Sequence, residues 1–263
     1  MKNLLIILSL MLTSLAFVSC GSDKEDEPNY TNQTMLVGNT YTIPGKDLGW
    51  TSDNELIASV SNGIVTAEHV GEATVRNGSK TFKVTVTPKY DTFKEPYMNF
   101  GASMSSVKSF MSGYTLNQEK SETLLYDGRF PVMYYLYTFK NAGMYLSSAI
   151  IKSSSVDTDE MVEFMKERYV FVTMDDSKYY FAFLSPDKKM MVILQLDTLN
   201  YQVVYEVVYA AYNSASSAPA QAAKMMKAQL NPTSTGTNAE VKTEFTRLNN
   251  VLSEMPQTFN SNN

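Results

Sequence analysis

The chain has 263 residues, 44% of them hydrophobic and 19% charged, which is the balance of a folded protein. Its net charge of −5 offers no basic surface for nucleic acid, so we expect no nucleic-acid partner. The single histidine, His69, lies in a predicted turn and is expected at the surface. With Cys20 as the only cysteine, the chain lacks the ligands of thiolate or multi-histidine zinc sites and the partners of a Cys–His nucleophile.

A short apolar segment precedes Cys20. Lys2 supplies a positive charge, residues 4–17 are mostly apolar, and small Ser19 stands just before the cysteine. A charged start, a short apolar core and a small-residue end are typical of a secretory signal peptide. The apolar core is shorter than the ~20 residues of a membrane-spanning helix. Residues 1–19 are therefore predicted to be a signal peptide. Two kinds remain possible, an ordinary signal peptide that leaves Cys20 as an unmodified thiol and a lipoprotein signal that leads to a lipid on Cys20.

The terminal cysteine makes this segment similar to the bacterial lipoprotein signal, although Phe17 stands where that motif prefers Leu. The resemblance implies that Cys20 is diacylated and becomes the mature N-terminus. Residues 20–33 are predicted to be a solvated acidic tether, because a run such as Asp23–Glu27 cannot bury apolar surface. An acidic run at this place resembles the surface-export signal of Bacteroidetes lipoproteins. It implies an outer-membrane protein that faces the cell exterior.

Residues 34–88 read as an all-β sandwich. Short apolar runs alternate with turn signals such as Asn62-Gly63 and Asn77-Gly78, which favour tight hairpins because both residues tolerate positive φ. Residues 80–86 alternate cleanly, with one apolar face. Trp50 is expected in the core of the sandwich rather than in a ligand platform.

Several motifs in this region resemble the group 2 bacterial immunoglobulin-like (Ig-like) domain. They are Trp50-Thr51-Ser52, Ile57-Ala58, Asn62-Gly63, Val65-Thr66-Ala67 and Gly71-Glu72-Ala73-Thr74-Val75. The match runs from about residue 34 to 86 and is short at its N-terminal side, which implies a missing edge strand. Domains of that family are usually spacers or adhesin modules on surface proteins, so the resemblance implies a spacer.

Residues 89–99 are predicted to be a mobile polar linker that few contacts cross. Residues 100–212 then show the same order of elements twice, a capped helix followed by three strands. The helices are capped by Ser103 and Asp157, and the strands are expected at 122–126, 132–139 and 144–152 and again at 178–184, 190–196 and 201–209. The sequence thus predicts a multidomain chain, an Ig-like sandwich followed by an α+β domain of two αβββ repeats.

This order of elements resembles the β-lactamase-inhibitor-like and small outer-membrane-lipoprotein folds. The resemblance includes no signature motif and implies a fold without a function. Residues 213–263 are predicted to be a C-terminal helical extension, with helices at 220–230 and from Asn238 onward. The second has an apolar stripe, which we expect to dock on the domain's own sheet because short helices need tertiary packing. The stripe consists of Val241, Phe245, Leu248, Leu252 and Met255.

Strand alternation assigns the aromatic residues to two faces of the predicted sheet. Helix residues Phe110, Met111, Phe164 and Met165 are expected to pack together on one face. The other face is expected to hold Tyr134, Tyr180, Gln202 and Glu206, covered by the C-terminal helices or by a partner. Tyrosine has an apolar ring and a polar tip, which suits a glycan or protein partner, so these four are the candidate partner-binding residues. Ordinary packing is the alternative, because tyrosine is enriched in strands.

Carboxylates cluster along the second predicted helix, where acidic residues favour the helix dipole and stay solvated. They are Asp157, Asp159, Glu160, Glu163 and Glu167. The chain shows no calcium loop, phosphate-binding glycine loop or nucleophile elbow. We therefore predict no catalytic residue, no metal and no cofactor.

These features predict a non-enzymatic cell-surface lipoprotein. It is anchored through the lipid on Cys20, and an Ig-like spacer presents an α+β domain to a glycan or protein partner. An envelope assembly or structural lipoprotein and a polysaccharide hydrolase are the alternatives. The acidic tether implies export to the cell surface, which favours the surface-binding lipoprotein over the envelope assembly lipoprotein. The missing catalytic signature argues against the hydrolase.

Overall fold

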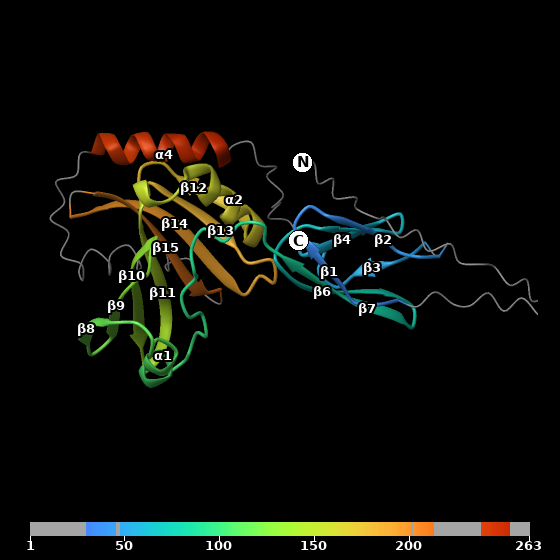
Figure 1. The fold of residues 1–263 in the computed structure, drawn as a ribbon, viewed down its shortest axis with the longest axis horizontal. Helices are drawn as coiled ribbons and strands as arrows, with labels where there is room; N and C mark the ends of the chain where they lie inside the picture. Colours follow the sequence, from blue (N-terminus) through green and yellow to red (C-terminus); the bar gives the residue numbers. More distant parts are fainter. Residues whose placement is uncertain (1–29, 46–47, 201, 213–237, 253–263) are drawn as a thin grey trace, which may run out of the picture.

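The computed structural model describes residues 30–45, 48–200, 202–212 and 238–252. The predicted signal peptide, Cys20, most of the tether and the predicted helix at 220–230 lie outside these residues. The described fold is mostly β-sheet with three α-helices. Figure 1 shows a smaller β region, coloured blue to teal, beside a larger sheet with α2 and α4 on one side.

Two sheets of the N-terminal region enclose one apolar core. The first has the order β1 (Gln33–Leu36), β7 (Lys80–Thr87), β6 (Gly71–Asn77), β3 (Thr51–Ser52), and β1 runs parallel to β7. The second has the order β2 (Thr40–Thr42), β5 (Ile64–Ala67), β4 (Ala58–Ser61). We refer to this part of the chain as the sandwich.

The sandwich core is formed as the sequence predicts. Trp50 is only 5% exposed, and its ring centroid lies 5.7 Å from that of Phe82. Asn62 and Gly63 take positive φ values of 51° and 74° and join β4 to β5 in a tight hairpin. The expectation for His69 is wrong: its ring is half-buried, Nδ1 donates to the carbonyl of Leu56 at 2.5 Å, and burial lowers its pKa.

The larger sheet has eight antiparallel strands and is built from two halves of the chain. Each half supplies one helix and then four strands, and the last strands of the halves, β11 and β15, pair at the centre. The order across the sheet is β12 (Val170–Asp175), β13 (Tyr180–Leu184), β14 (Met190–Leu199), β15 (Gln202–Ala211), β11 (Gly143–Lys152), β10 (Val132–Lys140), β9 (Thr123–Asp127), β8 (Leu116–Lys120). The predicted three strands per half are therefore too few, because the outer strands β8 and β12 were not recognised.

One face of this sheet, which we call the helix face, holds the main core. The helices α1 (Met104–Phe110) and α2 (Thr158–Arg168) are capped by Ser103 and Asp157, as predicted, and pack on this face. Met111, Phe164 and Met165 are buried there. The expectation for Phe110 is wrong: its side chain is 46% exposed and contacts Tyr97 in a tilted arrangement, with the ring centroids 4.7 Å apart.

The last helix, α4 (Asn238–Leu252), also docks on the helix face. Four members of the predicted stripe, up to Leu252, are buried, and the ring of Phe245 stacks on Phe181 at 4.6 Å. Glu244 accepts hydrogen bonds from Thr158, at 2.9 Å, and from the hydroxyl of Tyr205. Docking on the chain's own sheet is confirmed, but α4 does not cover the face that carries the candidate tyrosines.

The segment 89–99 is firmly packed, contrary to the expectation of a mobile linker. Phe93 is buried, and its ring centroid lies 4.4 Å from that of Phe164. The Tyr135 hydroxyl donates to the carbonyl of Lys94 at 2.8 Å, and the backbone N–H of Tyr97 donates to the Tyr137 hydroxyl at 3.2 Å. These contacts hold the segment against the helix face of the first half of the sheet.

Candidate functional site

Strand pairing places three of the four predicted residues in one row across the far face, the side of the sheet opposite the helix face. Tyr180 on β13 pairs with Gln195 on β14, which pairs in turn with Glu206 on β15. On the other side of Glu206, Ile150 on β11 is its partner, and Tyr134 on β10 comes next. Four inter-strand spacings of about 4.8 Å separate the two tyrosines, so the row is about 19 Å long.

The row does not form one accessible surface. Tyr134 packs in an apolar cluster with Ile150, whereas Tyr180 packs in a separate cluster around Ile193. Glu206 lies between the clusters and is 1% exposed. Gln202 is exposed and pairs with Leu199 at the start of β15, four residues away from the row. The four candidates thus share a face without converging on a single site.

Glu206 is a buried carboxyl group in an apolar setting. One oxygen, Oε2, has no hydrogen-bond partner in the described structure, and the Ser148 hydroxyl bonds to the carboxyl group. Desolvation by burial, helped by the charge of Asp197, raises the pKa of Glu206 to about 8 in spite of the Ser148 hydrogen bond. At neutral pH this group is mostly protonated, which suits a structural role better than a charged contact to a ligand.

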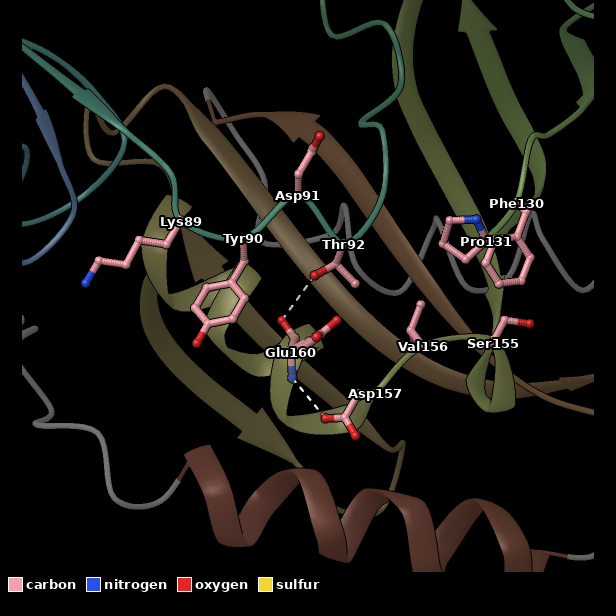
Figure 2. A pocket seen from close by; sticks show the side chains of 10 residues that line it. All are labelled: Lys89, Tyr90, Asp91, Thr92, Phe130, Pro131, Ser155, Val156, Asp157 and Glu160. Carbon is pink, nitrogen blue, oxygen red and sulfur yellow. Dashed lines mark hydrogen bonds between the residues drawn. The ribbon is translucent and has the colours of Figure 1, made fainter. Parts of the chain in front are cut away.

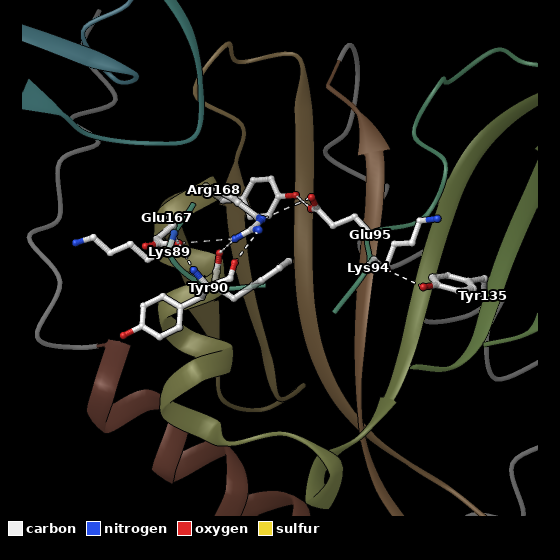
Figure 3. Close-up of polar contacts among 9 residues, drawn as sticks. Lys89, Tyr90, Lys94, Glu95, Tyr135, Glu167 and Arg168 are labelled. Carbon is white, nitrogen blue, oxygen red and sulfur yellow. Dashed lines mark hydrogen bonds and ion pairs between the residues drawn. The ribbon is translucent and has the colours of Figure 1, made fainter. Parts of the chain in front are cut away.

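The C-terminal end of α2 fixes segment 89–99 through buried charges (Figure 3). The Glu167 carboxylate accepts hydrogen bonds from the backbone N–H groups of Lys89, at 2.8 Å, and Tyr90, at 3.0 Å. Arg168 donates to the carbonyl of Tyr90 at 2.9 Å, and its Nε lies 3.6 Å from Oε2 of Glu95. The expectation that Glu167 lies on a solvated helix face is wrong, because it is 4% exposed.

The same end of α2 also contacts the sandwich. The backbone N–H of Val70 donates to the carbonyl of Glu167 at 2.7 Å. A second contact comes from the β13–β14 turn, where the carbonyl of Pro186 accepts a hydrogen bond from Nδ2 of Asn54 at 3.2 Å. Nearby, Tyr169 donates its hydroxyl to Glu95, and burial together with that carboxylate raises the pKa of Tyr169 well above its usual value. This network joins the sandwich, the connecting segment and the larger sheet.

A cavity of about 710 Å³ lies at this junction. Its volume is in the range of small-molecule sites, but its charged side chains already have partners. Glu72 pairs with Lys83 at 2.9 Å and Asp187 pairs with Lys189 at 3.5 Å, while Glu95 is held as described above. The junction cavity therefore offers a ligand little unused polar capacity.

A second hollow, of about 380 Å³, lies between three segments of the chain (Figure 2). We call it the Phe130 hollow. Its walls come from the connecting segment, from the β9–β10 turn and from the start of α2 with the 3₁₀ turn η1 (Ser153–Ser155) before it. The lining residues are Lys89, Tyr90, Asp91, Thr92, Phe130, Pro131, Ser155, Val156, Asp157 and Glu160.

The Phe130 hollow combines an aromatic ring with unused acceptors. Phe130 is 85% exposed, the largest exposure among the described large hydrophobic residues. Asp91 and Glu160 are exposed, and no hydrogen bond or ion pair to their carboxylates is found within the described residues. Thr92 donates to the backbone carbonyl of Glu160 at 3.3 Å, which fixes one wall to the other. A ring face beside free acceptors can bind a ligand that has both C–H faces and hydroxyl donors.

Hydrolytic chemistry in the hollow lacks its usual setting. A glycosidase needs two carboxyl groups, one of them an acid whose pKa is raised by burial. The three carboxylates of the hollow are all exposed, and Asp157 is occupied by the N–H groups of Asp159 and Glu160 at the start of α2. Within the ranges that the structure describes, no group of three or more metal-ligating side chains lies close enough to hold an ion.

No protein-family model, curated protein or solved structure matches the chain significantly. None of the helices in the described part of the chain has the length and apolar character of a transmembrane segment. The sequence signal for the Phe130 hollow is weak, because Gly128-Arg129-Phe130-Pro131 reads as an ordinary turn and its exposure depends on the whole fold.

Proposed function

We propose that the chain is a non-enzymatic, lipid-anchored surface protein that binds a glycan in the Phe130 hollow. The observation that supports this most directly is the Phe130 ring, which is 85% exposed and lines the same hollow as Asp91 and Glu160, whose carboxylates have no partner within the described residues. A single exposed apolar residue needs no explanation, but the flat apolar face of an aromatic ring on the rim of a polar hollow can pack on the C–H face of a sugar ring.

The architecture suits a protein that presents a site away from a membrane. We propose that the sandwich is an Ig-like spacer and that the larger sheet consists of two copies of a helix followed by four strands. The two sheets around Trp50 and the symmetric strand order centred on β11 and β15 support this reading. The buried contacts of Glu167 and Arg168 make spacer and sheet one arm, so a ligand in the hollow would be held at a fixed distance from the sandwich.

Phe130→Ala tests the proposed site. The substitution is expected to weaken glycan binding by about fivefold to thirtyfold, because a central aromatic anchor contributes about 1–2 kcal/mol. The full chain in detergent would be screened on immobilised polysaccharides, and dissociation constants for those that bind would be measured by calorimetry. The melting temperature should stay within about 1 °C, because the ring is almost fully exposed.

Leu48→Ala is the matched control, since Leu48 is 77% exposed on the sandwich. It should leave glycan binding unchanged. Equal affinities of Phe130→Ala and the unmodified protein for every polysaccharide that binds would remove the hollow as the site.

Cys20→Ala tests the anchor. We expect the variant to lose membrane attachment, because two acyl chains on one residue account for nearly all of such binding. The measurement is the share of protein that sediments with membranes after a salt wash, with Ser19→Ala as the control that retains the cysteine. A Cys20→Ala protein that still sediments with membranes would contradict the proposed lipidation.

A further inference from the structure

Next to the Phe130 hollow lies a cluster of aromatic rings and cations, which we call the aromatic–cation patch. Its residues are Lys94, Tyr97, Phe110, Tyr114 and Arg129. The patch and the hollow share two segments of chain. Residues 89–92 line the hollow and residues 94–97 belong to the patch, while Phe130 and Arg129 are neighbours in the β9–β10 turn.

The cations of the patch lie on ring faces rather than on carboxylates. The guanidinium of Arg129 lies 4.7 Å from the ring centroid of Tyr114 and donates to the carbonyl of Gly113 at 2.8 Å. The ammonium of Lys94 lies 5.6 Å from the Tyr114 ring and 5.8 Å from that of Phe110. Neither cation forms an ion pair within the described residues, in contrast to nearby Lys108, which pairs with Glu119 at 2.6 Å.

This arrangement keeps two cations exposed and ready to pair with an anion. Lys94, Phe110 and Arg129 are all exposed, and Tyr97 holds the Phe110 ring at a centroid distance of 4.7 Å. A guanidinium binds a carboxylate through two parallel hydrogen bonds, and the adjacent rings offer flat apolar faces. The chemistry that fits is a ring-shaped ligand that carries a carboxylate, such as a uronic acid.

The hollow next to the patch has the opposite preference. Its exposed carboxylates, Asp91 and Glu160, repel an acidic sugar but can accept hydrogen bonds from the hydroxyls of a neutral one. A uniformly acidic chain would therefore gain at the patch and lose at the hollow. A chain in which acidic and neutral sugars alternate satisfies both surfaces.

We infer that the glycan is a mixed polysaccharide, with an acidic sugar on the aromatic–cation patch and a neutral sugar in the Phe130 hollow. The inference rests on the proposed glycan-binding function and specifies its ligand class. An acidic peptide is disfavoured, because its successive carboxylates would meet those of the hollow and its side chains offer no sugar ring to Phe110 and Phe130.

The test uses four polymers against the full chain in detergent: an alternating glucuronate–N-acetylglucosamine polymer, all-acidic polygalacturonate, neutral dextran and polyglutamate. We expect the alternating polymer to bind most tightly and its affinity to fall as salt rises from 50 to 300 mM, as screening of exposed charges requires. Lys94→Gln combined with Arg129→Gln should weaken its binding about fivefold to tenfold and reduce the salt dependence.

Two further variants separate charge from structure. Lys108→Gln removes a nearby, partly exposed cation that already has a partner, and should change affinity for the alternating polymer less than twofold. The double variant Lys94→Arg, Arg129→Lys keeps both charges and should retain most of the affinity for the alternating polymer. A loss of affinity as large as that of the double Gln variant would show that charge is not the cause.

Each other outcome overturns a defined part of the inference. Tight binding of dextran alone would refute the acidic subsite and leave the proposed function intact. If polygalacturonate or polyglutamate bound as tightly as the alternating polymer, the mixed ligand would be refuted. Tight binding of polyglutamate would in addition identify the ligand as an acidic protein and not a glycan. Binding of no polysaccharide on a broad array, with the protein folded, would refute the proposed function as well.

Discussion

Arg168→Ala is expected to lower the free energy of unfolding by about 3–4 kcal/mol, the lower half of the usual range for removing one partner from a buried ion pair. The substitution leaves Glu167 and Glu95 without their cation and removes the hydrogen bond to the carbonyl of Tyr90. It also removes the guanidinium from the ring of Phe164, 3.7 Å away. The lower half of that range applies because Glu95 is partly exposed, so solvent screens some of the loss.

The measurement is urea unfolding followed by far-ultraviolet circular dichroism and, separately, by the fluorescence of Trp50. Trp50 is the only tryptophan and reports on the sandwich alone, so the two signals show whether the sandwich and the larger sheet unfold together. They should coincide in the unmodified protein and separate in the variant. Lys166→Ala is the control, because its pair with Glu163 is partly exposed and should contribute less than about 1 kcal/mol. A loss in Arg168→Ala no larger than in this control would contradict the structural role of the network.

Glu206→Gln is expected to stabilise the protein at pH 8 by roughly 4 kcal/mol and to flatten its dependence on pH. The pKa of Glu206 is raised from 4.5 to about 8 in the folded state by desolvation, with a smaller contribution from the charge of Asp197. Between these two values the folded protein holds a proton that the unfolded chain has released. Stability therefore falls as pH rises through this window, by up to about 1.4 kcal/mol per pH unit, and is greatest below pH 4.5 as far as this group is concerned.

Glutamine has the shape of the protonated glutamic acid and no charge to lose, so the variant should lack this slope. Melting temperatures or urea midpoints between pH 5 and pH 8.5 would measure it. Glu119→Gln, at an exposed carboxylate that pairs with Lys108, serves as the control and should leave the slope unchanged. A variant as sensitive to pH as the unmodified protein would show that Glu206 is ionised in the folded state.

The sequence was most informative where local chemistry decides the structure. Ser103 and Asp157 start the helices α1 and α2 because their side chains accept the free N–H groups of the first turn. Trp50 and the alternating residues 80–86 identify a sandwich core, since period-two alternation leaves one face for burial. The stripe on α4 was recognisable for a similar reason, although the face on which it docks was not.

Elements that depend on distant partners could not be predicted. The edge strand β8 is exposed along its whole length, so no apolar pattern distinguishes it, and β12 follows α2 without a turn signal. A register shift between Val132 and Tyr134 places Val132 in the core of the helix face, whereas strict alternation assigns it to the far face. Such a bulge is set by pairing with β11 and leaves no mark in the sequence.

The candidate site shows the same division. That Tyr134, Tyr180 and Glu206 share a face follows from alternation, and strand pairing places them in one row. The burial of Glu206 and the exposure of Phe130 depend on how whole segments pack against one another. Neither the alternation of apolar residues along a strand nor the composition of the chain encodes that packing.

The pairing of β11 with β15 at the centre of the sheet also bears on how the chain is made. Residues 143–152 leave the ribosome well before residues 202–211, so the strand that ends up in the middle is at first an unpaired edge. That edge carries Ala149, Ile150 and Ile151, all fully buried in the finished fold. Contacts so far apart in sequence form slowly, and an apolar unpaired strand is the kind of surface on which other chains associate. We therefore expect the chain to be most prone to aggregation while its first half is complete and its second half has not yet paired with it.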